Sequence, residues 1–273
     1  MTPLRIILTG GHSGIGLELS KMLLAEGHHL GLIVRSISRK ADTLAILGRN
    51  KAVDFFVADL SLQSEVVRVA AEIEAKWSHI DVLFNNAGVL LEDLFMSPQE
   101  NEMHFEVNTL SPFLLTRKLE KALRNSAQPI VINTVTGGQH TVKTFDAETL
   151  KQPERFKKLF GPYMQSKYAL SLMMNHLAET WPKVRIVNVD PGPNKTKMTA
   201  GNGMPGWLVP LRNLFFSRPQ KGAKLLYQAA FDPSHGAQSG VYLSGNKVKP
   251  LRLRITEAQR EKILSSVNRA HLV

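Results

Sequence analysis

The segment that decides the fold is the run Ile6-Ile7-Leu8-Thr9-Gly10-Gly11-His12-Ser13-Gly14-Ile15-Gly16. Its apolar first part predicts a buried strand that ends at Thr9, and a helix is expected to begin near Gly14. Glycines at positions 10, 14 and 16 allow a sharp turn and a close approach of the backbone to a ligand, because a Cβ would clash there. The free N–H groups at the helix N-terminus suit a pyrophosphate. A plain tight turn without a ligand is the alternative interpretation.

The composition is typical of a globular protein. The 273 residues are 43% hydrophobic and 21% charged, enough for one large α/β domain or two small ones. Cysteine is absent, which excludes disulfides and thiolate metal sites. We therefore expect no metal site and a reducing, cytoplasmic location. Because the first strand begins close to Met1, we expect no signal peptide. No apolar run approaches the roughly 20 residues of a membrane helix.

The formal net charge of +11 bears on the class of partner. Such a charge could assist binding to phosphates, acidic ligands or an anionic membrane surface. The basic residues are dispersed, and no run rich in Lys and Arg is interleaved with aromatic residues. We interpret the charge as a solvated basic exterior and expect no nucleic-acid partner.

Apolar strand patterns alternate with helical patterns along the whole chain. Ser61 and the capping box Ser97-Pro98-Gln99-Glu100 are predicted to begin helices. This alternation predicts a parallel, doubly wound sheet with a ligand beyond the carboxyl ends of its strands. Without repeats or a linker, residues 1–273 are expected to form a single domain. Strands are expected at 6–9, 30–34, 53–57, 82–84, from 130, at 184–189 and at 240–243.

Six motifs occur in an order that carries a resemblance. They are Thr9-Gly10-x-x-x-Gly14-Ile15-Gly16, Asp59-Leu60, Asn85-Asn86-Ala87-Gly88, Asn108, Tyr163-x-x-x-Lys167 and Pro191-Gly192-x-x-x-Thr196. From residue 4 to about 245, the chain resembles the short-chain dehydrogenase/reductase family. The resemblance implies an α/β Rossmann-type fold, a doubly wound and mostly parallel seven-stranded sheet with helices on both faces. The long loop with Phe145-Asp146, and the stretch from Gly222-Ala223 to Ser239-Gly240-Val241-Tyr242, resemble the retinol-dehydrogenase-like branch.

Tyr163 and Lys167 are the candidate catalytic pair. They are one helical turn apart, so both side chains can reach one pocket. A nearby ammonium and an oxidised nicotinamide would favour the phenolate and lower the tyrosine pKa from about 10. Tyr163 would then be the acid in carbonyl reduction and the base in alcohol oxidation. The resemblance implies that Lys167 also holds the nicotinamide ribose and that Asn108 orients a water in a proton relay.

One position departs from the family pattern. The family has a serine hydroxyl just after the fifth strand to hold the substrate carbonyl, and our alignment puts Val135 at that position. A slip of one residue would supply Thr134 or Thr136. We choose Thr136, which precedes two glycines, as the fourth catalytic residue. Two solvated threonines beside an impaired site are the alternative.

The end of the second strand indicates the cofactor. NAD-preferring relatives carry an acidic residue there, whereas this chain has Val34 followed by Arg35. A 2′-phosphate would meet Arg35, assisted by Arg39 and His12, so NADP is expected, with Asp59 on the adenine amino group and Leu60 beside the ring. The predicted cofactor-binding residues are Gly10, His12, Ser13, Gly14, Ile15, Gly16, Arg35, Asp59, Leu60, Asn86, Ala87, Gly88, Tyr163, Lys167, Pro191, Gly192 and Thr196.

Residues 198–216 are expected to be a substrate lid. The stretch is apolar, which favours an apolar substrate, although packing on its own domain or on a second subunit is the alternative. We expect an NADPH-dependent oxidoreductase that acts on a small apolar carbonyl or alcohol. A catalytically weak dinucleotide-binding sensor or partner-binding protein of the same fold is the second hypothesis, motivated by the lost serine. A homodimer or homotetramer is the expected assembly.

Overall fold

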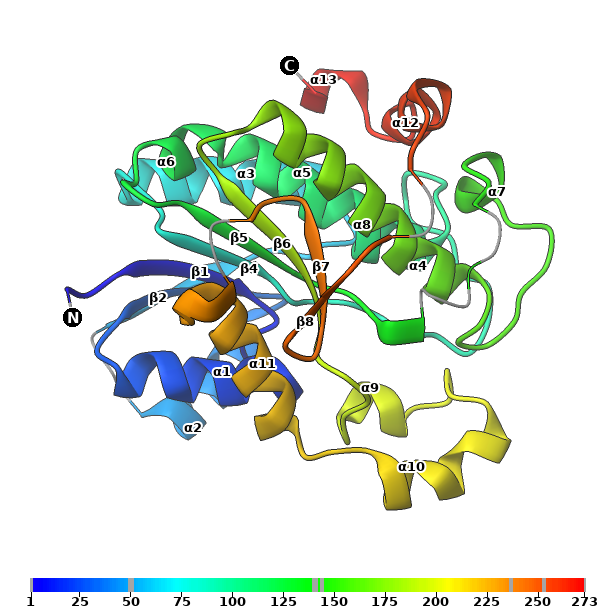
Figure 1. The fold of residues 1–273 in the computed structure, drawn as a ribbon, viewed down its shortest axis with the longest axis horizontal. Helices are drawn as coiled ribbons and strands as arrows, with labels where there is room; N and C mark the ends of the chain where they lie inside the picture. Colours follow the sequence, from blue (N-terminus) through cyan, green and yellow to red (C-terminus); the bar gives the residue numbers. More distant parts are fainter. Residues whose placement is uncertain are drawn as a thin grey trace.

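Eight strands form one sheet in the described part of the chain, which covers residues 2–48, 52–138, 142, 145–235, 238–251 and 254–272 of a computed structural model. The strand order is β3-β2-β1-β4-β5-β6-β7-β8, and only the pairing of β7 with β8 is antiparallel in this range (Figure 1). The strands are β1 Arg5–Thr9, β2 His29–Val34, β3 Val53–Val57, β4 Val82–Asn85, β5 Ile130–Thr134, β6 Arg185–Asp190, β7 Val241–Ser244 and β8 Lys247–Lys249.

Helices cover both faces of the sheet. Helices α1 (Gly14–Ala25), α2 (Ile37–Leu47) and α11 (Pro219–Phe231) lie on one face, and α3 (Gln63–Lys76), α5 (Ser111–Lys118), α6 (Glu120–Arg124) and α8 (Pro162–Thr180) on the other (Figure 1). No helix of the described ranges has the length and apolar content to cross a bilayer. The remaining helical segments are α4 Met103–Phe105, the π-helix η1 Glu106–Leu110, α7 Glu148–Lys151, α9 Lys197–Ala200, η3 Gly206–Leu208, α10 Val209–Phe215, η4 Pro233–His235, α12 Glu257–Leu264 and α13 Arg269–Leu272.

Each central strand is buried on both sides. In β1, Ile6 and Leu8 pack into the core under α1 and α11, whereas Ile7 points into the opposite core under α3 and α5. Successive side chains of a strand alternate between its faces. A strand covered by helices on both faces therefore needs a continuous apolar run, and this run is the reason the first segment of the sequence is informative.

The strand order reverses at β1. This strand pairs with β2 on one side and with β4 on the other, so the crossover connections leave it in opposite directions. Such a switch point leaves a crevice beyond the carboxyl ends of the two strands. The predicted doubly wound α/β fold is confirmed, and it puts the turns after β1 and β4 at this crevice.

The prediction of seven strands is wrong, because the sheet has an eighth strand, β8. Strand β8 turns back from β7 through Gly245 and Asn246, with Ser244 opposite Lys247. Gly245 has a φ of +60°, the left-handed conformation that a two-residue hairpin turn requires. The Gly-Asn pair was a hairpin signal, but all three residues of β8 are exposed and carry no apolar pattern.

Two predicted helix caps are also wrong. Ser61 does not cap α3; its N–H and its hydroxyl both donate to Asp59 Oδ1, at 2.9 and 2.8 Å. The box at 97–100 is a turn, and the helix begins only at α4, with Glu102 as the N-cap. The reason is tertiary: Ser97 donates its hydroxyl 3.0 Å to the buried carboxylate of Glu106, which also accepts from Asn101 at 2.7 Å.

Candidate active site

A cavity of about 990 Å³ opens at the carboxyl ends of the central strands. Its wall combines the turns after β1 and β4, the segments after β5 and β6, and the first two turns of α8. Asp59 and Asn108 are the predicted site residues that do not form part of this wall. Those that line it are Gly10, His12, Ser13, Gly14, Ile15, Gly16, Arg35, Leu60, Asn86, Ala87, Gly88, Thr136, Tyr163, Lys167, Pro191, Gly192 and Thr196.

The glycine turn is packed too tightly for side chains. A Cβ built on Gly16 would lie 2.2 Å from the carbonyl oxygen of Gly10 and 2.6 Å from Asn86 Nδ2. Gly10 has a φ of +69°, and a Cβ there would lie 3.1 Å from the Ala87 Cα. The turn after β1 thus lies directly against the turn after β4, and backbone rather than side chains forms this part of the wall.

Gly88 brings three predicted residues together. A Cβ at this position would lie 2.9 Å from Asn108 Oδ1 and 3.2 Å from Lys167 Nζ. Lys167 is almost fully buried, and its ammonium donates a 2.9 Å hydrogen bond to the carbonyl oxygen of Thr134 at the end of β5. Burial lowers the pKa of Lys167 to about 8. Its ammonium is therefore still the main form at neutral pH.

Asn108 holds the segment after β4 to helix α8. It lies in the π-helix η1, a distortion that is frequent at functional sites. Its Oδ1 accepts from the Val89 N–H at 2.8 Å, and its Nδ2 donates to the Val89 carbonyl at 3.1 Å and to Ser166 Oγ at 3.2 Å. Ser166 in turn donates to the carbonyl oxygen of Tyr163 at 2.7 Å. The amide thus links two walls of the cavity, and the water relay stays a prediction.

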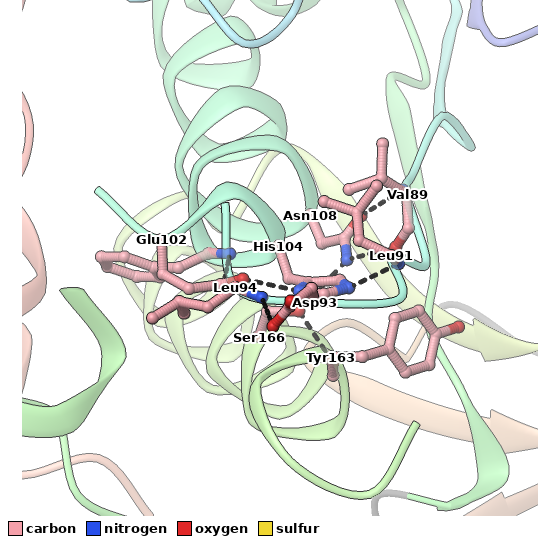
Figure 2. A network of polar contacts seen from close by, with 10 residues as sticks. Val89, Leu91, Asp93, Leu94, Glu102, His104, Asn108, Tyr163 and Ser166 are labelled. Atoms are coloured by element: carbon pink, nitrogen blue, oxygen red, sulfur yellow. Dashed lines mark hydrogen bonds and ion pairs between the residues drawn. The ribbon is translucent and has the colours of Figure 1, made fainter. Parts of the chain in front are cut away.

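A buried histidine packs behind Tyr163. The ring centroids of His104 and Tyr163 are 5.9 Å apart in an edge-on arrangement. His104 Nδ1 lies 2.6 Å from Glu102 Oε1, and its Nε2 accepts from the Leu91 N–H at 2.9 Å, so the ring is held from both sides. Figure 2 shows the Tyr163 hydroxyl pointing away from this cluster. Glu102 and His104 thus hold the base of the tyrosine ring while its hydroxyl end stays available.

The protein's own groups shift the pKa of Tyr163 in the direction opposite to our expectation. Burial and the nearby Asp190 carboxylate raise the pKa of Tyr163 to about 12. Both effects disfavour the phenolate, the first by removing water and the second by like-charge repulsion. The ammonium of Lys167 is hydrogen-bonded to the carbonyl oxygen of Thr134. The hydroxyl is therefore protonated at neutral pH.

Asp190 is a cavity residue that sequence reasoning missed. It ends β6, where its Oδ1 accepts from the Gly192 N–H at 2.9 Å and its Oδ2 from the Ser244 hydroxyl at 3.4 Å. A Cβ on Gly137 would lie 2.4 Å from Oδ2, so the carboxylate lies against the segment after β5. The available signal was its place just before Pro191 at the end of a buried strand.

The segment after β5 offers two threonine hydroxyls. Val135 is buried at 3% exposure, packs into the core, and donates its N–H to the Val189 carbonyl at 2.9 Å. Thr134, Val135 and Thr136 all line the cavity. The Thr134 hydroxyl donates to Asn86 Oδ1 at 3.4 Å, and Thr136 Oγ1 accepts from the Gly138 N–H at 3.4 Å. The choice of Thr136 stays a prediction.

Cations gather at the opposite end of the cavity. Arg35, Arg39 and His12 all line its wall. Burial first, and then Arg39, Arg35 and Lys197, lower the pKa of His12, which indicates that the three cations lie around its ring. Asp42 also lines this end, with a carboxylate oxygen 3.7 Å from Arg39. This end is suited to an anion.

Asp59 lies outside the cavity wall, whereas Leu60 lines it. Asp59 Oδ1 accepts from Ser61 and lies 4.0 Å from the Nε of Arg35. The structure therefore gives this carboxylate a local partner and a position beside Arg35. Its predicted contact with adenine stays a prediction.

The expected lid is divided into short segments. Helix α9, the 3-10 turn η3 and helix α10 lie within residues 197–215, and residues 201–205 between α9 and η3 are not helical. Thr196 caps α9 and packs on the glycine turn, since a Cβ on Gly14 would lie 3.1 Å from its methyl group. Met198, Met204 and Phe216 line the cavity. One side of this segment thus forms a wall of the cavity.

Comparison with known proteins identifies the family. The sequence profile described as short chain dehydrogenase matches residues 5–146, more than half of the chain. This chain belongs to the short chain dehydrogenase family. Tyr163 and Lys167 lie beyond the matched segment, so their assignment depends on the geometry described above.

Relatives of this short chain dehydrogenase include retinol dehydrogenases, as the resemblance implied. Retinol dehydrogenase 11 of Mus musculus is 29% identical, over 87% of this chain and 76% of the relative. Polyprenol dehydrogenase of Homo sapiens is 27% identical, over 95% of this chain and 82% of the relative. The Pseudomonas aeruginosa RhlG/NADP active-site complex superposes with a TM-score of 0.69 at 23% identity, covering 88% of this chain and 94% of that one. The retinol-dehydrogenase-like branch is thus confirmed.

The proximity of Asp190 makes the tyrosine of this short chain dehydrogenase harder to ionise. We expect Asp190→Asn to lower the pKa of Tyr163, because a negative charge beside the phenolate is removed, while burial keeps it above the ordinary value of about 10. A stopped-flow jump to about pH 11, read by phenolate absorbance before the protein unfolds, should show more ionised tyrosine than in the wild type. Subtracting the signal of Tyr163→Phe assigns the difference, and Asp42→Asn is the control. An unchanged Tyr163 signal would remove Asp190 as a cause.

Proposed function

We propose that this chain is an NADP(H)-dependent oxidoreductase that transfers a hydride between the nicotinamide and an apolar carbonyl or alcohol. The observation that carries the proposal is one shared cavity. Tyr163 and Lys167, one turn apart on α8, line the same cavity as the glycine turn after β1. A proton donor and a phosphate-binding turn are the two parts that hydride chemistry with a dinucleotide requires.

The cavity fits a dinucleotide at two points. A Cβ at Gly16 or at Gly88 would meet protein atoms closer than 3.0 Å, so the backbone forms a smooth cradle there. His12 Nδ1 is buried and has no hydrogen-bond partner within the described residues. An unpaired buried nitrogen is costly, and a ligand phosphate or hydroxyl at the cationic end would satisfy it.

The proton is handled by Tyr163. When bound, the nicotinamide supplies or accepts the hydride at the substrate carbon. Tyr163 donates its hydroxyl proton to the carbonyl oxygen in reduction, and in oxidation its phenolate takes the alcohol proton. A pKa of about 12 keeps the donating form populated at neutral pH. The protein alone therefore presents the proton-donating form that carbonyl reduction requires.

Two neighbours position the donor. Lys167, held by the Thr134 carbonyl, keeps a positive charge at the same wall and can hold ribose hydroxyls. Asn108 acts through Ser166, which accepts its amide hydrogen and donates to the Tyr163 carbonyl. Asn108 is thus a positioning residue for the start of α8.

The substrate is expected to be apolar. The cavity wall that includes Tyr163 also includes the apolar side chains of Leu90, Met164, Met198 and Phe216. Two relatives are named as dehydrogenases of retinol and of polyprenol, which are both apolar alcohols. The same class of alcohol, or the carbonyl derived from it, suits this cavity.

Removal of one hydroxyl tests the reaction. We expect Tyr163→Phe to abolish turnover of an apolar ketone or alcohol panel while NADPH binding and the unfolding midpoint stay near those of the wild type. Tyr227→Phe, a tyrosine on α11 outside the cavity wall, is the matched control. A Tyr163→Phe enzyme that keeps more than a small fraction of the turnover would show that another group donates the proton.

Arg35 is expected to decide between the two cofactors. The wild type should bind NADPH more tightly than NADH, and Arg35→Ala should reduce this preference by about 1.5 kcal/mol, the lower end for a charge-assisted hydrogen bond, because the side chain is 63% exposed. Titration calorimetry with both cofactors measures the difference. Arg117→Ala, an exposed arginine on α5, is the control. Equal affinities of the wild type would contradict the assignment.

The hydroxyl beside the substrate oxygen is tested at position 136. Thr136→Val keeps the β-branched shape, and removing one preorganised donor costs roughly 2.7–4 kcal/mol of transition-state stabilisation, a hundredfold or more in kcat. Thr134→Val is the control for the neighbouring hydroxyl. Turnover that is unchanged in Thr136→Val would remove Thr136 as the donor. Turnover that first appears in Val135→Ser, in a protein otherwise inactive, would favour the catalytically weak dinucleotide-binding protein.

A further inference from the structure

An exposed apolar surface lies on the outer side of the lid segment. We call it the lid face and define it by Phe160, Trp207, Val209, Leu211, Leu214 and Phe215. Leu214, Phe215 and Trp207 are 75%, 66% and 65% exposed, which is unusual for large apolar side chains that follow one another. In Figure 1, η3 and α10 project from the edge of the molecule, beyond the helices that cover the sheet.

Two distant segments form one continuous face. The rings of Phe160 and Trp207 stack, with centroids 6.3 Å apart and planes 3° apart. Phe160 precedes α8, and Trp207 lies in η3. Lys157 Nζ lies 5.7 Å from the centre of the Phe160 ring, so a cation lies directly beside the apolar surface.

The chain around the lid face is strongly and uniformly basic. Residues 191–231 contain no Asp or Glu and carry six of the eleven net positive charges, on Lys195, Lys197, Arg212, Arg218, Lys221 and Lys224. Within the described ranges, no carboxylate forms an ion pair with any of these cations. The side chains of Arg212 and Lys195 donate hydrogen bonds within the lid segment, to Thr196, Thr199 and Asn213. Lys197 lines the cavity, so Arg218, Lys221 and Lys224 are the three that remain available to an external anion.

The lid face adjoins the cavity. Phe160 belongs to both, and Phe216, the next residue after the exposed Phe215, lines the cavity wall. The same short segment therefore has an outer apolar surface and an inner surface toward Tyr163.

We propose that the lid face docks on an anionic lipid bilayer and that the apolar substrate enters the cavity from there. Apolar side chains that enter the interface, with basic residues beside anionic headgroups, are the two contributions that hold a protein on a membrane surface. A second copy fits less well, because a two-fold contact would oppose the same basic residues. The entry route rests on the proposed function, whereas the docking rests on the lid face alone.

Trp207 is a local reporter of docking. The other tryptophans, Trp77 and Trp181, are 3% and 4% exposed, so changes in emission at the membrane arise from Trp207. With vesicles of phosphatidylcholine and phosphatidylserine, we expect a blue shift and quenching by brominated acyl chains. The response should be weak with phosphatidylcholine alone and should fall at high salt. No shift with either vesicle would overturn the proposal.

Paired variants separate docking from folding and catalysis. Leu214→Asp with Phe215→Asp should reduce vesicle co-sedimentation at least tenfold, whereas Ile46→Asp with Val248→Asp, two exposed apolar residues elsewhere, should not. Lys221→Glu with Lys224→Glu should remove the phosphatidylserine dependence. Equal binding by all variants would overturn the proposal. So would a blue shift without vesicles that grows with protein concentration, because it would assign the lid face to a second copy.

The two proposals fail separately. Vesicle binding is measured without cofactor or substrate, so a protein that binds vesicles but turns over no apolar substrate would contradict the proposed function only. A protein that reduces apolar carbonyls but does not bind anionic vesicles would contradict the docking only. In the enzyme that does both, Leu214→Asp with Phe215→Asp should raise the apparent KM for vesicle-borne substrate and leave kcat on a water-soluble one unchanged.

Discussion

The buried hydroxyl of Thr9 connects the two turns on which the cavity depends. Its oxygen accepts from the N–H groups of Asn86 and Ala87, both at 2.9 Å, and its hydrogen donates to the Phe84 carbonyl at 3.3 Å. One side chain thereby provides hydrogen bonds to several backbone groups at the ends of β1 and β4, where the hydrogen bonding between strands stops. The glycine turn can then lie against Ala87, and Gly88 lies beside Asn108 and Lys167.

Burial acts on the two central side chains in opposite directions for one physical reason. It raises the pKa of Tyr163, whose charged form is an anion, and lowers that of Lys167, whose charged form is a cation. Asp190 adds to the first shift. At neutral pH the result is a protonated tyrosine beside a charged lysine. The distant end of the cavity carries Arg35 and Arg39, so the two ends differ in charge as well as in shape.

The lid connects the interior of the cavity with the outside. Its inner residues Met198, Met204 and Phe216 form the cavity wall, and its outer residues expose apolar surface to water. The lid consists of short helices interrupted by Gly and Pro, which allows inner residues to face the cavity and outer residues to face water. A single long helix would instead bury one stripe of side chains and expose the opposite stripe along its whole length. An apolar substrate class and an apolar outer surface are two consequences of this arrangement.

The sequence alone determined the features that depend on local pattern. The apolar run 6–9 and the alternation of strand and helix patterns predicted the doubly wound sheet, and the glycine turn and the spacing of Tyr163 and Lys167 predicted residues that line the cavity. These predictions hold because strand alternation and helical periodicity act over a few residues. The resemblance added the segments Asn86-Ala87-Gly88 and Pro191-Gly192, together with Thr196 and Asn108. No local pattern indicated that Asn108 lies in a π-helix.

Only the tertiary structure decided the features made by contacts between distant segments. The helix predicted at 97–100 gives way to a turn because Ser97 bonds to the buried Glu106. Asp190 lies near Tyr163 because β6 ends and α8 begins at the same cavity. Phe160 stacks on Trp207 across more than forty residues of chain. The periodicity of the sequence does not predict such pairs. Their energies depend on burial and on the proximity of charges, and both arise only when folding brings the strand ends together.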